Sequence, residues 1–207
     1  VTGANGDGIY AYNYGTDLTI DSRAGTVTGS RTGIDAYNYG FGALTITTAN
    51  VSGTTGVGIS AVNYGSDLTV NSVAGSVSGT SGIVASNYGL GALSITTANV
   101  TGAAADGIFA FNLGTGLTIN SSAGRVTGAS TGISATNYGS GALRITTGAV
   151  TGANGDGIYA YNYGTDLTID SRAGTVTGSR TGIDAYNYGF GALTITTANV
   201  SGTTGVG

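Results

Sequence analysis

Hydrophobic and polar residues alternate in short runs that return along the whole chain. In residues 9–14, Ile, Ala and Asn occupy every second position, and Tyr occupies the positions between them. In residues 18–21, Leu and Ile alternate with Thr and Asp, and Val27 stands between two Thr residues. Alternation of this kind, in residues that favour extended backbone, predicts β-strands, and frequent Gly disfavours helix. We therefore expect three short strand segments, which the rest of the chain repeats.

The first segment belongs to the motif Gly-Ile-x-Ala-x-Asn-(Tyr/Leu)-Gly, which occurs eight times. Successive copies are 25 residues apart, except for one step of 24 between Asn63 and Asn87. A fixed period of this length is the signature of a solenoid, in which each repeat stacks on its neighbours. The predicted fold class is all-β: a parallel β-helix (β-solenoid) with about 25 residues and three short strands per coil.

We expect a single β-solenoid over residues 1–207, with eight coils and a partial ninth. At the parallel-strand spacing of about 4.8 Å, eight coils make a rod roughly 40 Å long. Residues 150–207 repeat residues 1–58 without a change, at an offset of 149 residues. This identity, and ends without a capping sequence, predict that the chain is part of a longer tandem array. The expected coils are residues 1–25, 26–50, 51–75, 76–99, 100–124, 125–149, 150–174, 175–199 and the partial 200–207.

The constant columns of the repeat predict which side chains point inward. The column of Ile9 is Ile in all eight coils and the column of Ala11 is Ala in all eight, whereas the column of Tyr10 varies. A crowded interior restricts side-chain size and solvent does not, so Ile, Ala, Leu and Val are expected inside, and Tyr10 and Tyr12 outside. Glycines between the segments are expected to adopt positive φ at the corners, as at Gly15, Gly25, Gly29 and Gly33.

Composition narrows the classes of function. The chain has six Arg or Lys and ten Asp or Glu residues, for a net charge of −4, which argues against a nucleic-acid partner. It has no Cys and no His, which excludes disulfides and thiol chemistry and leaves no histidine base for neutral pH. No apolar run reaches the roughly 18 residues of a transmembrane segment. We therefore expect neither an enzyme nor a membrane-spanning segment in this sequence.

Two blocks of the repeat, Val-Thr-Gly-x-x-x-Gly-Ile-x-Ala-x-Asn-x-Gly and Leu-Thr-Ile-x-(Ser/Thr)-x-x-Gly, resemble the repeats of bacterial autotransporter passenger domains. The resemblance covers all 207 residues and is one of repeat style, without a catalytic signature. It implies a right-handed parallel β-helix in a secreted, adhesin-like protein at the extracellular bacterial surface, attached to the outer membrane. The near-identical repetition would suit a fibre, sheath or filament.

The most regular polar feature is one Asn in every coil. We expect these side-chain amides to hydrogen-bond along the stack and to the backbone of a turn; a polar binding strip is the alternative. This expected structural Asn ladder consists of Asn13, Asn38, Asn63, Asn87, Asn112, Asn137, Asn162 and Asn187.

All 13 Tyr fall in three adjacent columns at the first segment, so one outer face should carry the aromatic rings. Stacked rings would stabilise the coils by about 0.5–1.5 kcal/mol per pair. An exposed aromatic face can also be an interface. The candidate interface residues are Tyr10, Tyr12, Tyr14, Tyr37, Tyr39, Tyr64, Tyr88, Phe109, Phe111, Tyr138, Tyr161, Tyr163, Tyr186 and Tyr188.

Other candidate sites are weaker. An acid pair for glycan cleavage needs carboxylates about 5–10 Å apart, but Asp17 and the next Asp of its column, Asp67, are two coils apart, about 10 Å. The Gly-rich segment that ends at Asp7 resembles a calcium-binding repeat, and the outer Thr columns suggest an ice-binding array that Arg144 interrupts. Asn50, Asn99, Asn120 and Asn199 begin glycosylation sequons. We expect no catalytic residue, no cofactor and no metal.

The preferred hypothesis is a structural or adhesive extracellular repeat protein that forms a rod, fibre or filament on the bacterial surface. Its expected partners are further copies of itself, end to end or side by side, and a host surface, an abiotic surface or a glycan. The alternative is a glycan-binding or glycan-processing β-helix in which Tyr12, Tyr37 and Tyr161 stack on sugar rings.

Overall fold

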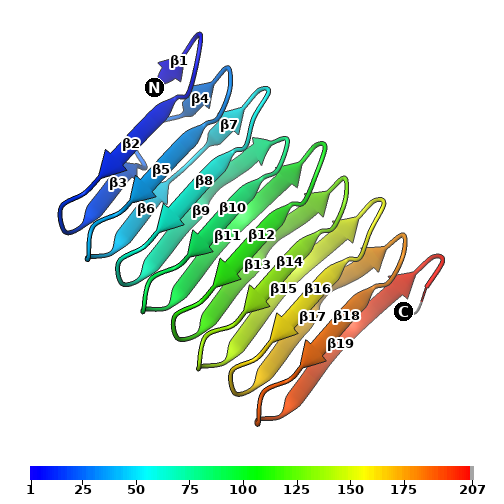
Figure 1. Cartoon of the computed structure of the whole chain (residues 1–207). Coiled ribbons are helices and arrows are strands. Elements are labelled where there is room, and N and C mark those ends of the chain that lie inside the picture. The colour runs from blue at the N-terminus through cyan, green and yellow to red at the C-terminus, as the bar shows by residue number, and fades with distance from the viewer. Residues whose placement is uncertain (206–207) are drawn as a thin grey trace.

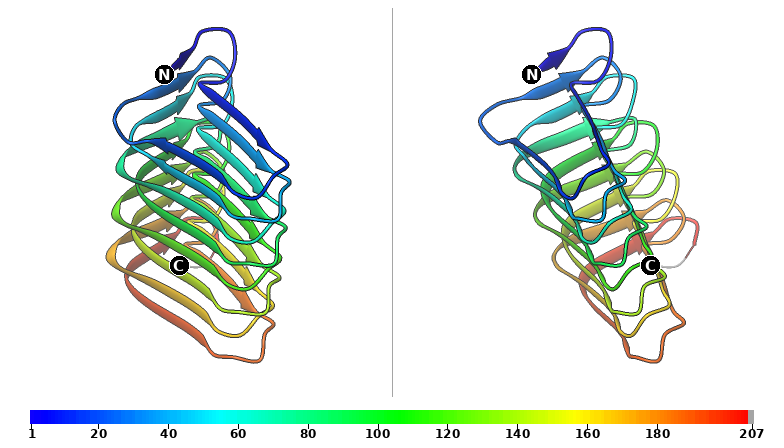
Figure 2. Two further views of the ribbon diagram at one scale, coloured as in Figure 1. Left: turned by 90° about the vertical axis from the view of Figure 1, so that its left-hand side faces the viewer. Right: turned by 60° about the vertical axis from the view of Figure 1, so that its left-hand side comes forward.

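A computed structural model of the protein describes residues 1–205. These residues form a parallel β-solenoid of about eight coils and contain no helix (Figure 1). The coils stack along one axis, and the first and last coils lie at opposite ends of the stack (Figures 1 and 2). The predicted fold class, with about 25 residues and three strands per coil, is confirmed.

The first strand segments of the coils form an eight-stranded parallel sheet. Equivalent residues pair without a shift, so that Ile9 lies opposite Ile34 and Asn13 opposite Asn38. The same register continues to the last strand of this sheet, where Asn162 lies opposite Asn187. The strands of this sheet are β2 (Ile9–Asn13), β5 (Ile34–Asn38), β8 (Ile59–Asn63), β10 (Ile83–Asn87), β12 (Ile108–Asn112), β14 (Ile133–Asn137), β16 (Ile158–Asn162) and β18 (Ile183–Asn187).

The second and third segments form an eleven-stranded sheet. From residue 68 onward the two segments join into one long strand, and the ladder shifts register at the corner between them, as between Thr97 and Asn99. A β-bulge absorbs such a bend without ending the strand. The separate strands are β1 (Thr2–Gly3), β3 (Leu18–Ser22), β4 (Val27–Gly29), β6 (Leu44–Thr48) and β7 (Val51–Gly53). The joined strands are β9 (Leu68–Gly79), β11 (Leu93–Gly102), β13 (Leu117–Gly128), β15 (Leu143–Gly152), β17 (Leu167–Gly178) and β19 (Leu193–Gly202).

The core consists of columns of identical or similar apolar side chains. In an interior coil, Ile83, Ala85, Leu93 and Ile95 are 0% exposed, and the same positions are buried in the coils above and below. The outward position Tyr10, in contrast, is 60% exposed. The expected assignment of inner and outer faces is therefore confirmed.

The corner between the second and third segments holds a polar column inside the core. Ser and Thr alternate from coil to coil at this position, and their hydroxyls bond in pairs: Ser72 to Thr97 at 2.8 Å and Ser121 to Thr147 at 2.9 Å. All four residues are 0% exposed. A buried hydroxyl without a partner is costly, so these pairs stabilise the contact between the two coils that they join; Ser171 of the same column is buried without a hydrogen-bond partner.

The expectation of positive φ at the glycines is wrong: no glycine among the described residues has a positive φ. At Gly29 and Gly33 the glycine is required by close approach instead. A Cβ at Gly29 would lie 1.9 Å from the carbonyl oxygen of Thr32, and a Cβ at Gly33 would lie 2.4 Å from the side chain of Val51 in the next coil. At Gly25 a Cβ would meet nothing within 4 Å.

Candidate functional site

The asparagine ladder lies inside the coil at the end of the first strand. Seven Nδ2–Oδ1 hydrogen bonds of 2.7–3.0 Å connect the eight residues from Asn13 to Asn187. Nδ2 also donates to a backbone carbonyl of its own turn, as from Asn38 to Gly42 at 3.0 Å, and Oδ1 accepts from the backbone N–H two residues later. The six interior members are 0% exposed, so they present no polar strip to a ligand.

Tyrosines form a second ladder on the outside of the same corner. We define the tyrosine ladder as Tyr14, Tyr39, Tyr64, Tyr88, Tyr138, Tyr163 and Tyr188. From Tyr14 to Tyr88 successive ring centroids are 5.5, 4.9 and 5.1 Å apart, and from Tyr138 to Tyr188 they are 4.9 and 5.4 Å apart. The planes of neighbouring rings differ by only 14–23°. The ring faces therefore cover one another, and ring edges face the solvent.

One coil interrupts this ladder, because Leu113 takes the place of Tyr. Phe111, from the neighbouring outward column, bridges the interruption with ring centroids 5.5 Å from Tyr88 and 5.7 Å from Tyr138. Phe109, opposite Val84 in the sheet, extends the apolar face without stacking on another ring. The aromatic surface is thus continuous along the rod. The tyrosine ladder itself is divided into two parts, Tyr14 to Tyr88 and Tyr138 to Tyr188.

The aromatic surface widens at two places. They have the same sequence, because residues 150–207 repeat residues 1–58. Around Tyr12, four tyrosines lie within 6.1 Å of its ring, and around Tyr161 four equivalent tyrosines lie within 6.3 Å. We call these groups the two tyrosine pads. The first consists of Tyr10, Tyr12, Tyr14, Tyr37 and Tyr39, and the second of Tyr159, Tyr161, Tyr163, Tyr186 and Tyr188.

Phenols of the pads, among them Tyr12, Tyr37 and Tyr161, have a raised pKa. A hydrogen bond with Tyr39 raises the pKa of Tyr12, and one with Tyr163 raises the pKa of Tyr161; the two hydroxyls of the latter pair are 3.0 Å apart. Burial raises the pKa of Tyr37. These three phenols are therefore uncharged at physiological pH, and one aspartate stands beside each pad, Asp35 opposite Tyr10 and Asp184 opposite Tyr159.

A row of apolar side chains that the sequence analysis did not identify projects beside the tyrosine ladder. Phe41 is 93% exposed and Leu90 is 87% exposed, and Phe190 is also fully exposed. Each occupies the extra residue that even coils carry between the motif Asn and the following Leu. We call these three residues the corner knobs. The signal in the sequence was a bulky apolar residue between two glycines, where no core position was expected.

The aspartates of the odd coils act as acceptors for the backbone of the next coil. Asp17 Oδ1 accepts from the N–H of Ala43 at 2.7 Å, and Asp67 accepts from Ala92 at the same distance. Those N–H groups belong to the longer turn of the even coils. The aspartates thus compensate for the difference in turn length, a role that requires no partner beyond this chain.

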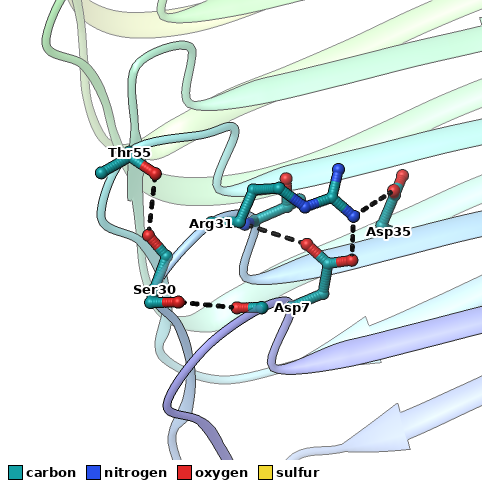
Figure 3. Close-up of polar contacts among 7 residues, drawn as sticks. Asp7, Ser30, Arg31, Asp35 and Thr55 are labelled. Atoms are coloured by element: carbon teal, nitrogen blue, oxygen red, sulfur yellow. Dashed lines mark hydrogen bonds and ion pairs between the residues drawn. The ribbon is translucent and has the colours of Figure 1, made fainter.

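Asp7, which precedes the first strand of its coil, also accepts from a backbone N–H of the next coil (Figure 3). Its Oδ1 accepts from the N–H of Thr32 at 3.1 Å, and its other oxygen pairs with Arg31. Arg31 also lies 3.7 Å from Asp35, so one guanidinium faces two carboxylates (Figure 3). Both oxygens of Asp7 are therefore engaged within the chain, and residues 1–205 contain no group of three or more acidic side chains that could hold a metal.

Two further ion pairs join residues two positions apart on the surface. Arg23 pairs with Asp21, and Arg172 with Asp170, each at 2.6 Å. Hydrogen bonds from Arg172 hold the pKa of Asp170 at about 2, below its ordinary range. Arg144 lies between Thr118 and Thr168 in the outer column of the second segment and interrupts the Thr array there.

Comparison of the chain with models of protein families, with curated proteins and with solved structures gives no match. The resemblance to autotransporter passenger domains therefore stays a prediction from repeat style. Within residues 1–205, no helix is long and apolar enough to cross a bilayer. The β-solenoid itself is compatible with a structural or adhesive role.

Proposed function

We propose that the protein is a structural and adhesive repeat protein whose coils form a rod at the extracellular surface of a bacterium, and that it carries no catalytic activity. One observation carries the proposal: an aromatic surface follows the rod through all eight coils. Adhesion through such a surface is additive, because each coil contributes a similar contact. Contact with another copy or an apolar surface would cover the rings and the corner knobs together.

The polar groups support this proposal by their internal pairing. The asparagine ladder is buried, and Asp17 and Asp67 accept from the next coil. An active site or a specific polar binding site normally departs from its surroundings, with groups held free for substrate. Here the same pairings recur between successive coils, as expected for a structural stack.

The geometry weakens the glycan hypothesis. A sugar stacks on the face of an aromatic ring, but the face of Tyr12 lies against Tyr39 at 5.0 Å, and the face of Tyr161 is crowded by Tyr188 at the same distance. Tyr37 is likewise near-parallel to Tyr39. Because a neighbouring ring competes for the face of each of these rings, edge contacts with a partner protein or surface are favoured.

Sedimentation velocity and adsorption to apolar beads test the adhesive role. We expect the wild-type chain to self-associate or adsorb, and the double variant Phe41→Ser/Phe190→Ser to do so at least several-fold less. Val73→Ser is the matched control, because Val73 is 44% exposed but belongs to β9 in the other sheet. A wild-type chain that neither associates nor adsorbs, or a double variant equal to it, would refute the adhesive role.

Immunogold electron microscopy of the source cells tests the location. We expect label on rods or fibres outside the cell envelope. Label confined to the cell interior would refute the extracellular assignment. Self-association is tested separately by the sedimentation experiment.

A further inference from the structure

Tyrosine is the principal oxidisable side chain of this protein. The chain has no Cys, Met, Trp or His, but 13 Tyr. Thiols, thioethers and indoles are the groups that usually consume oxidants before phenols do. An oxidant that reaches this rod therefore reacts mainly with the tyrosine phenols.

The tyrosine ladder places phenols next to one another in the folded state. Tyr39, Tyr64 and Tyr88 are 39%, 48% and 42% exposed, so an external oxidant can reach each of them. Their ring centroids are 4.9 and 5.1 Å apart with nearly parallel planes. Two phenoxyl radicals in this arrangement need only rotate about their side-chain bonds to bring their ring carbons into contact.

We propose that the tyrosine ladder is a site of oxidative cross-linking, at which dityrosine bonds join successive coils of one chain. The oxidant is hydrogen peroxide used by a haem peroxidase. Each of two phenols gives up one electron and one proton, and the two phenoxyl radicals form one carbon–carbon bond between the ring positions next to the hydroxyls. The ring hydrogens then move to the oxygens, so two tyrosines and one hydrogen peroxide yield one dityrosine and two water molecules.

The ladder also predicts where cross-links do not form. Tyr88 and Tyr138 are two coils apart, about 10 Å at the parallel-strand spacing, because Leu113 occupies the position between them. Phe111 fills the space but has no hydroxyl to oxidise. Cross-linking should therefore join neighbours within each part of the ladder and stop at Leu113. This proposal rests on the ladder alone and does not depend on the adhesive role.

Peptide mapping tests the proposal on the whole chain. The protein is oxidised at low concentration with a haem peroxidase and hydrogen peroxide, the denatured monomer is isolated, and a protease that cleaves before Asp releases residues 35–66, 67–105 and 106–155. We expect dityrosine between 35–66 and 67–105, since Tyr64 and Tyr88 are the adjacent pair. We expect at least tenfold less linkage between 67–105 and 106–155.

Two variants test the pattern of cross-links, one by removing a linkage and the other by adding one. Tyr64→Phe keeps the stacked ring but removes the phenol, and should abolish the linkage between 35–66 and 67–105. Leu113→Tyr completes the ladder, and should create the linkage between 67–105 and 106–155. Circular dichroism of both variants verifies the fold before oxidation. The proposal is overturned if the wild-type monomer holds no dityrosine, if Tyr64→Phe leaves the first linkage unchanged, or if the second linkage is equally abundant with Leu113.

Discussion

Replacement of Asn87 by Ala tests how much the asparagine ladder contributes to stability. Asn87 is 0% exposed; its Oδ1 accepts from Asn63 at 2.9 Å and from the N–H of Gly89 at 3.4 Å, and its Nδ2 donates to Asn112 at 3.0 Å. Alanine leaves two groups without any partner, the Gly89 N–H and the Asn112 Oδ1, whereas Asn63 Nδ2 and the Gly91 carbonyl oxygen keep other hydrogen bonds. At about 1–3 kcal/mol for each unsatisfied group, the free energy of unfolding should fall by about 2–6 kcal/mol.

The same replacement at Asn13 is the matched control. Asn13 is half-buried at the end of the ladder, and it donates to Asn38 at 2.7 Å. When that donor is lost, Asn38 Oδ1 still accepts from the N–H of Gly40 at 3.3 Å. Water can also reach the exposed end, so Asn13→Ala should cost no more than about 1.5 kcal/mol.

Urea unfolding followed by circular dichroism measures both costs by linear extrapolation. Because a solenoid can open at one end before the rest, hydrogen exchange at the amides of residues 83–87 gives a second, local reading. Protection there should fall in Asn87→Ala and hold in Asn13→Ala. Equal losses of stability for the two variants would refute the argument that burial of the ladder sets its contribution.

Three further predictions concern the glycines, the coil alternation and an ion pair. Gly29→Ala should lower the free energy of unfolding by about 1–3 kcal/mol because its Cβ would strike a carbonyl oxygen, whereas Gly25→Ala, with open space, should be neutral or stabilise by up to about 1 kcal/mol; similar urea midpoints would contradict this. Deleting residues 51–99, one odd and one even coil, should shorten the rod by about 10 Å in small-angle scattering and leave it folded. Deleting residues 51–75 places two even coils in contact and should lower the melting temperature. If the deletion of residues 51–99 lowered the melting temperature more than the deletion of residues 51–75, the importance of the odd–even alternation would be contradicted. The Asp170 carboxyl should titrate near pH 2 by side-chain NMR, so that its ion pair contributes stability above about pH 4 and loses it as pH falls toward 2; a midpoint near 4 would contradict this pairing.

The sequence by itself determined the fold and the two faces of the coil. A period of 25 residues leaves a solenoid as the architecture that keeps every copy of the motif equivalent. Constant Ile and Ala columns and a variable Tyr10 column separated the interior from the surface, because packing restricts size and solvent does not. The position of one Asn per coil also indicated a stacked amide column, since identical side chains in a parallel, in-register stack lie about 4.8 Å apart.

Only the tertiary structure decided how neighbouring coils meet. The sequence places Tyr39 and Tyr64 in one column but not the angle of their rings, and that angle decides whether ring faces or ring edges meet the solvent. It places Asp17 in a turn but not against Ala43 of the next coil. It shows Gly29 at a corner, where a carbonyl oxygen, rather than a positive φ, excludes a side chain. Each of these features depends on contacts between residues a full coil apart, and the distance and angle of such contacts are set by packing, which a repeat pattern alone does not contain.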